Sequence, residues 1–146
     1  MSTLVKNEGE FDASFPVKGK DFADAGLVSS KIKQRLMKKG ISEIAIRRAA
    51  IVIFEAEVNI ISYARKGIIR YYTTTDSIII EAIDEGPGIA DIELAMQEGY
   101  STADDAIREM GFGAGMGLSN IKRYSDDSEI SSVIGKGTYL RSVIKI

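Results

Sequence analysis

The sequence reads Gly111-Phe112-Gly113-Ala114-Gly115-Met116-Gly117-Leu118 in its C-terminal third, preceded by Asp84-Glu85-Gly86-Pro87-Gly88-Ile89. Glycine at every other position removes side chains where a backbone must approach a ligand closely or adopt a positive φ. The stretch 111–118 leads into residues 118–124, which have the composition of a helix start. A glycine-rich turn before a helix N-terminus presents unpaired N–H groups and the positive end of the helix dipole, which together bind phosphate. The pattern therefore predicts a nucleotide site, with the rest of the chain as its support.

Composition limits the possible functions of the 146 residues, which we expect to form one domain, 1–146. The net charge of −2 gives no basic field that would favour nucleic acid. The absence of cysteine and histidine excludes disulfides and thiolate metal sites, and leaves proton transfer to a carboxylate, Lys or Tyr. No apolar run approaches the length of about 18 residues that a membrane span needs, and the N-terminus lacks the apolar core of a signal peptide. We therefore expect no membrane partner and a cytoplasmic location.

Hydrophobic periodicity predicts an α/β fold. We expect a strand within 10–17, an amphipathic helix over 21–39 that ends at Gly40, and a longer, mostly buried helix over 42–65 that Ser42 caps. Strands should follow at 68–74 and 77–84, then a short helix at 91–98, a helix from the glycine run to about 126, and strands at 129–134 and 138–145. This order fits a two-layer sandwich in which helices cover one face of an antiparallel or mixed, mostly antiparallel, sheet.

Polar residues interrupt the buried second helix. Glu55 and Asn59 are four residues apart and share one face, whereas Glu57 points elsewhere and is expected to be structural or on the surface. Burying a carboxylate is costly and raises its pKa, which suits a general base. Two ordinary explanations remain open: Glu55 as a surface partner of Arg47, Arg48 or Lys66, and Asn59 as a buried amide satisfied by backbone.

Four segments, taken in order, resemble the nucleotide-binding boxes of the gyrase, Hsp90, histidine-kinase and MutL (GHKL) ATPases, which share the Bergerat fold. Glu55-x-x-x-Asn59 is similar to the N box, and residues 84–89 are similar to the first glycine box. Gly113-x-Gly115-x-Gly117-Leu118 is similar to the second glycine box, and Gly135-Lys136-Gly137-Thr138 to the closing G-x-G-T element. The match covers nearly the whole chain.

The resemblance implies a role for each box in binding ATP and Mg²⁺. Asn59 would coordinate Mg²⁺, and Glu55 would take the proton from an attacking hydroxyl or water. Asp84 would accept a hydrogen bond from the adenine amino group, with Thr138 bridging to adenine through water; an acceptor-only carboxylate favours adenine over guanine. The backbone at Gly86, Gly88 and Ile89 would pass under the base, and the phosphates would receive N–H groups from Gly113, Gly115, Met116, Gly117 and Leu118. The ordinary alternatives are a turn aspartate, a strand threonine and hinge glycines.

Residues 95–102 and Tyr63 are most similar to the anti-sigma-type serine/threonine kinases, in particular the RsbT-like stressosome branch. This resemblance implies a Mg-ATP-dependent kinase that phosphorylates Ser or Thr on a STAS-domain partner. The freed kinase would then bind a downstream phosphatase or sigma-regulatory protein. Two alternatives stay open: an ATP-gated binding module with little turnover, and a histidine-kinase-type catalytic domain that acts in trans on another protein's His.

Overall fold

The computed structural model describes residues 10–96 and 117–146. Five strands form one sheet in the order β1-β2-β3-β5-β4, and every neighbouring pair is antiparallel. The sequence pattern left open whether the sheet is antiparallel or mixed, and the structure shows that it is antiparallel. The strands are β1 (Ala13–Lys18), β2 (Lys66–Thr73), β3 (Ser77–Glu85), β4 (Asp127–Val133) and β5 (Gly137–Lys145).

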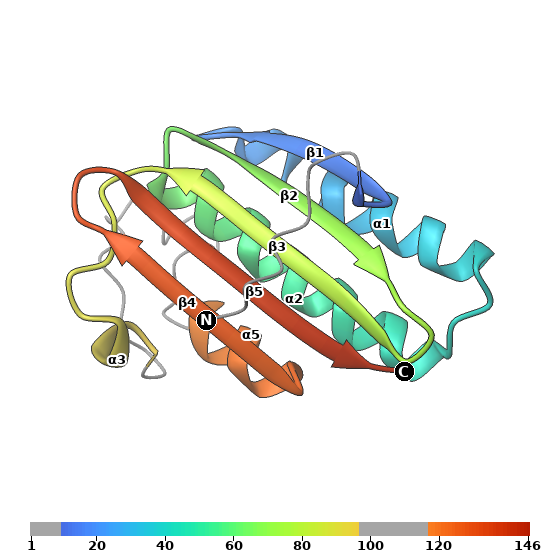
Figure 1. Ribbon diagram of the computed structural model, residues 1–146. Coiled ribbons are helices and arrows are strands. Elements are labelled where there is room, and N and C mark those ends of the chain that lie inside the picture. The colour runs from blue at the N-terminus through green and yellow to red at the C-terminus, as the bar shows by residue number, and fades with distance from the viewer. Residues whose placement is uncertain (1–9, 97–116) are drawn as a thin grey trace.

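Helices cover one face of the sheet and lie behind it in Figure 1. They are α1 (Leu27–Lys38), α2 (Glu43–Tyr63) and α5 (Gly117–Tyr124), with α2 packed between the other two. A 3₁₀ turn (Phe22–Asp24) and the short helix α3 (Ile92–Ala95) complete the described elements. Alternate strand residues point at the helices and form the core with them, among them Ile78, Ile80, Leu140 and Ile144. The expected two-layer α/β sandwich is confirmed.

The first helix is shorter than the periodicity predicts, because Gly26 takes a φ of 94° and separates the 3₁₀ turn from α1. A left-handed residue cannot continue a right-handed helix. The buried carboxylate of Glu57 on α2 then caps α1, since it accepts hydrogen bonds from Val28 N and Ser29 N, each at 3.2 Å. Of the two roles expected for Glu57, structural or surface, the structural one is therefore correct, and its side chain joins α1 to α2.

Helix α2 begins where the sequence predicts. Ser42 is its N-cap, and its side-chain oxygen accepts a hydrogen bond from Ala45 N at 3.3 Å. Within residues 10–96 and 117–146, no helix combines the length and apolar composition that a membrane crossing needs.

The antiparallel register brings the sequence boxes to one end of the sheet. β3 ends where β5 begins, and Ile83 pairs with Tyr139. Asp84 and Thr138 are the next residues toward that end, and both belong to the series of positions that face the helices. The residues of the first glycine box and of the G-x-G-T element therefore lie at the end of the sheet opposite the β2–β3 hairpin.

Candidate functional site

Asp84 and Thr138 lie side by side where β3 and β5 meet. Thr138 N donates a hydrogen bond to Asp84 Oδ1 at 3.1 Å, whereas Asp84 Oδ2 has no partner within the described residues. Burial raises the pKa of the Asp84 carboxyl above its ordinary value, and the Thr138 N–H acts in the opposite direction. One oxygen is thus held by the protein and the other is left to accept from a bound molecule.

Two glycines allow the turns at this end of the sheet to pack closely. Gly88 has a φ of 77°, and a Cβ there would lie 2.6 Å from the carbonyl oxygen of Val133. At Gly137 a Cβ would overlap the carbonyl oxygen of Asp84. The first glycine box therefore packs against the end of β4 at Gly88 and against the G-x-G-T element at Gly137, and a side chain at either position would disrupt that packing.

Ser132 on β4 connects these same elements, and the sequence analysis did not identify it. Its Oγ accepts a hydrogen bond from Ile89 N at 2.8 Å and lies 3.0 Å from both the Gly137 carbonyl oxygen and Thr138 Oγ1. The periodicity places Ser132 on a strand, but a serine in a strand carries no signal of such contacts. The structure thus adds a hydroxyl to the predicted adenine end of the site.

Glu55 and Asn59 lie on the side of α2 that faces α5. Asn120 Nδ2 donates a hydrogen bond to Glu55 Oε1 at 3.4 Å, and a Cβ on Gly117 would lie 3.5 Å from Glu55 Oε2. Glu55 is therefore beside the N-terminal turn of α5. Asn59 follows one helical turn later, is partly buried, and makes no hydrogen bond with the described residues. Among the described residues, therefore, no backbone group satisfies the amide of Asn59.

The surface ion pair considered for Glu55 is also wrong. Each of the three candidate cations binds another carboxylate: Arg47 pairs with Glu43, Arg48 with Asp126, and Lys66 with Glu85. Burial raises the pKa of the Glu55 carboxyl, and the hydrogen bond from Asn120 partly offsets this. A partly buried carboxylate with raised proton affinity thus lies next to a helix N-terminus.

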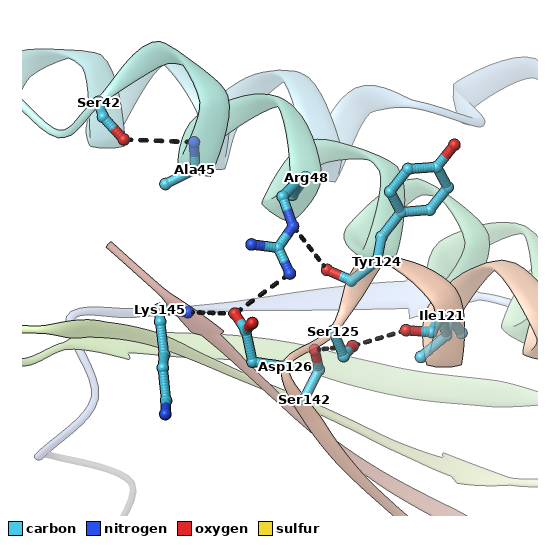
Figure 2. Close-up of polar contacts among 9 residues, drawn as sticks. All are labelled: Ser42, Ala45, Arg48, Ile121, Tyr124, Ser125, Asp126, Ser142 and Lys145. Atoms are coloured by element: carbon cyan, nitrogen blue, oxygen red, sulfur yellow. Dashed lines mark hydrogen bonds and ion pairs between the residues drawn. The ribbon is translucent and has the colours of Figure 1, made fainter.

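The other end of α5 is also fixed to the fold, as Figure 2 shows. Arg48 on α2 donates from Nε to the Tyr124 carbonyl oxygen at 3.2 Å and from Nη2 to Asp126 Oδ2 at 3.1 Å. Lys145 N on β5 donates to the same Asp126 oxygen at 2.7 Å. The backbone N–H of Lys145, together with Arg48, lowers the pKa of Asp126. These contacts set the position of α5, and with it that of Gly117, relative to α2.

The phosphate side of the predicted site is only partly described. Gly117 and Leu118 form the first turn of α5, with Leu118 buried. Gly113, Gly115 and Met116 lie outside the described residues. Part of the second glycine box can therefore be placed next to Glu55.

The donor set suits a magnesium ion that is shared with a nucleotide. Within the described part of the chain, no three acidic, His or Cys side chains are grouped to hold a metal. Mg²⁺ typically keeps several waters and takes one or two protein oxygens plus phosphate oxygens. The amide of Asn59, which has no partner among the described residues and lies one helical turn from Glu55, fits that requirement.

A hollow of about 240 Å³ also lies at this end of the sheet. Ile83, Val133 and Tyr139 line it, and these strand positions alternate with the helix-facing ones. Asp84, Ser132 and Thr138 of the site described above also line this hollow.

Comparison with known proteins gives a family match over most of the chain. The sequence model of the family described as "Histidine kinase-, DNA gyrase B-, and HSP90-like ATPase" matches residues 45–146. An anti-sigma F factor from Caldanaerobacter subterraneus subsp. tengcongensis is 36% identical over 105 residues, which are 72% of this chain and 65% of that protein. The serine/threonine-protein kinase RsbT of Bacillus subtilis is 36% identical over 100 residues, 66% of this chain and 69% of that protein.

The fold likeness extends over more of the chain. One chain in the crystal structure of the SiaB–SiaC complex from Pseudomonas aeruginosa superimposes with a TM-score of 0.64, covering 92% of this chain and 89% of that one. The sequence identity of 15% makes this a likeness of fold alone.

Proposed function

The chain belongs to the family of histidine kinase-, DNA gyrase B- and HSP90-like ATPases, a membership that implies ATP binding, and from that premise we propose that it is a Mg-ATP-dependent protein serine/threonine kinase. The relatives named anti-sigma F factor and RsbT support a kinase that works by exchanging protein partners. We further propose that residues 1–146 act as one domain, since β1 and α1 precede the matched residues and complete the sheet and the helix layer.

The observation that carries the proposal is the position of Glu55. Its Oε2 lies beside Gly117 in the first turn of α5, where the N–H groups of a helix start attract phosphate. Phosphate repels a carboxylate, so a carboxylate at a phosphate-binding helix start calls for a functional explanation. In our proposal Glu55 accepts the proton of the attacking hydroxyl, for which a pKa raised by burial is suited.

The remaining residues bind and orient the nucleotide. Asn59 offers its amide oxygen to Mg²⁺, which when bound would neutralise charge on the phosphate oxygens. Asp84 Oδ2 accepts from the adenine amino group while Oδ1 stays on Thr138 N. In the proposal the backbone at Gly86, Gly88 and Ile89 passes under the base. The N–H groups of the second glycine box, Gly113, Gly115, Met116, Gly117 and Leu118, hold the phosphates.

For the partner we propose a STAS-domain protein that carries the acceptor Ser or Thr. After phosphorylation the kinase would be released to bind a downstream phosphatase or a sigma-regulatory protein. The names of the two curated relatives are the support for this, because one is an anti-sigma factor and the other a serine/threonine-protein kinase.

The test is transfer of label from γ-labelled ATP to a STAS-domain protein, with Glu55→Gln compared to wild type. The variant keeps the size of the side chain but cannot act as a base, so we expect unchanged ATP affinity and a loss of transfer of at least 100-fold, the usual share of general-base catalysis. Glu129→Gln, on the exposed side of β4, is the matched control. Normal transfer by Glu55→Gln would remove Glu55 from the mechanism.

The same assay separates the alternatives. ATP binding without transfer to any STAS protein would favour a nucleotide-gated binding module. An acid-labile phosphate on a partner's His would favour the histidine-kinase type, whereas phosphoserine and phosphothreonine survive acid.

A further inference from the structure

We propose that the seam between α1 and α2 is a docking surface for a protein partner, and that it takes an acidic amphipathic helix of that partner. The α1–α2 seam consists of Lys33 and Met37 on α1 and of Ile44, Arg47 and Phe54 on α2, and all five side chains are exposed. None of them belongs to the four sequence boxes. The inference concerns a surface outside the proposed nucleotide site and does not depend on kinase activity.

Two contacts show how the helices run past each other. Ser29 Oγ on α1 donates a hydrogen bond to the carbonyl oxygen of Ala50 on α2 at 2.9 Å. A Cβ on Gly26, the residue before α1, would lie 3.5 Å from the ring of Phe54. The earlier residue of the α1 side thus meets the later residue of α2, so the two helices, which lie on the same face of the sheet in Figure 1, are antiparallel.

This alignment brings two basic side chains together in the middle of the seam. One helical turn from the hydrogen bond between the helices, α1 places Lys33 and α2 places Arg47 on the same side of the helix pair. One turn further, Met37 follows on α1 and Ile44 on α2. The seam therefore presents apolar side chains at both ends, with Phe54 at the end opposite to Met37, and a basic pair between them.

The α1–α2 hairpin concentrates positive charge. Residues 27–48 contain seven Lys and Arg and a single acidic residue, Glu43, so they carry a net charge of +6 in a chain whose total is −2. Among the described residues Lys33 has no hydrogen bond or ion pair, and Arg47 pairs with Glu43 at 3.7 Å while the two side chains stay 74% and 89% exposed. Neither cation lies at a helix C-terminus, where the helix dipole would favour it. The seam therefore attracts negative charge from outside the chain.

The exposed apolar side chains favour a protein partner over nucleic acid. Met37 is 60% exposed and Ile44 is 76% exposed, and a phosphate backbone offers no apolar surface to cover them. Ile44 and Phe54 are ten residues apart, which is about 15 Å along α2, and Arg47 lies between them. A partner helix laid along the seam matches this pattern if two apolar residues about three turns apart flank an Asp or Glu on the same face.

The seam and the proposed nucleotide site lie on opposite flanks of α2. Phe54 borders α1, whereas the next residue, Glu55, accepts a hydrogen bond from Asn120 of α5 on the other side. At the far end of the seam, Ile44 precedes Asn59 by fifteen residues, about 22 Å along α2. A bound partner helix would therefore leave the nucleotide site accessible.

The test is a titration of the full chain with a synthetic peptide of about 18 residues, which is long enough to form a helix. The peptide carries two Leu three turns apart with Glu between them on the same face, and ¹⁵N–¹H NMR spectra report where it binds. We expect the largest shifts at the backbone amides of the seam residues. A peptide with Lys in place of each Glu should bind at least about tenfold more weakly at physiological ionic strength.

Three variants locate the binding on the seam. Lys33→Glu should lower the affinity for the acidic peptide by about five- to tenfold, whereas Lys31→Glu, on the same helix but beside the ring of Phe15, should lower it by less than about twofold. Ile44→Gln should lower it by about tenfold, because its apolar contact is lost. All three side chains are exposed, so thermal unfolding of each variant should match wild type. Equal losses in Lys31→Glu and Lys33→Glu would overturn the inference, because net charge alone would then explain the binding.

The remaining outcomes separate other partners and the proposed function. No shift at millimolar peptide, or shifts centred outside the seam, would contradict the inference. Phosphatidylglycerol vesicles and a DNA duplex are tested in parallel, and binding of either through Lys33 without binding of the peptide would assign the seam to a membrane or to nucleic acid instead. If wild type binds the peptide at the seam but does not bind ATP, the proposed function alone fails.

Discussion

Replacing Asp84 by Asn tests the adenine end of the site most directly. The amide oxygen of Asn can keep the hydrogen bond that Asp84 Oδ1 accepts from Thr138 N at 3.1 Å, so the fold at the β3–β5 end should be preserved. The amide nitrogen then takes the place of Oδ2 and presents a donor to the adenine amino group, which is itself a donor. Asp84→Asn therefore removes the contact with the adenine amino group and keeps the hydrogen bond to Thr138 N that positions the side chain.

The expected size of the effect follows from that single contact. A hydrogen bond to a charged group contributes about 1.5–3 kcal/mol, which corresponds to roughly 10- to 150-fold in the dissociation constant. We expect the affinity of Asp84→Asn for ATP to fall within this range, with little change in the unfolding temperature.

The pH dependence gives the prediction a second readout. Burial raises the pKa of Asp84 in the nucleotide-free protein, so its carboxyl gains a proton at a higher pH than an exposed aspartate does. The protonated form loses an acceptor, so wild-type affinity for ATP should fall as the pH drops through that raised pKa. Asp84→Asn has no proton to gain there, and subtracting its profile removes the titration of ATP itself.

The assay is isothermal calorimetry with ATP, and Asp76→Asn is the control. Asp76 lies in the turn between β2 and β3, at the other end of the sheet, where it accepts from the hydroxyls of Thr74 and Ser77. Equal ATP affinities for wild type and Asp84→Asn, or identical pH profiles, would refute the assignment of Asp84 to adenine.

Two further predictions concern α5. Asn120→Ala removes the hydrogen bond that holds down the pKa of Glu55, so the acid limb of the pH–rate profile for phosphoryl transfer should move to higher pH; a limb that stays in place would separate Asn120 from Glu55. Arg48→Met removes the hydrogen bonds at 3.2 and 3.1 Å that fix the C-terminal end of α5 and should cost about 1–3 kcal/mol, or about 2–10 °C in thermal unfolding. Arg47→Met, which loses only an exposed pair at 3.7 Å with Glu43, should shift the unfolding temperature far less; similar shifts would contradict the role given to Arg48.

Local sequence pattern was sufficient to predict most of the helices and strands. The order of helices and strands, the Ser42 cap and the sandwich architecture agree with the structure because periodicity and capping are properties of neighbouring residues. The first helix was predicted too long, since the apolar spacing continues through Gly26 although its backbone breaks the helix.

The sequence by itself determined the family, and it supplied the candidate nucleotide-binding residues, because the spacing within each box is a local property and the four boxes occur in order. Only the tertiary structure decided what surrounds them. Asn120 reaches Glu55 across 65 residues of sequence, and Ile89 reaches Ser132 across 43. Contacts of this kind depend on sheet register and helix packing, so a serine in a strand or an asparagine in a helix gives no sign of them until the chain has folded.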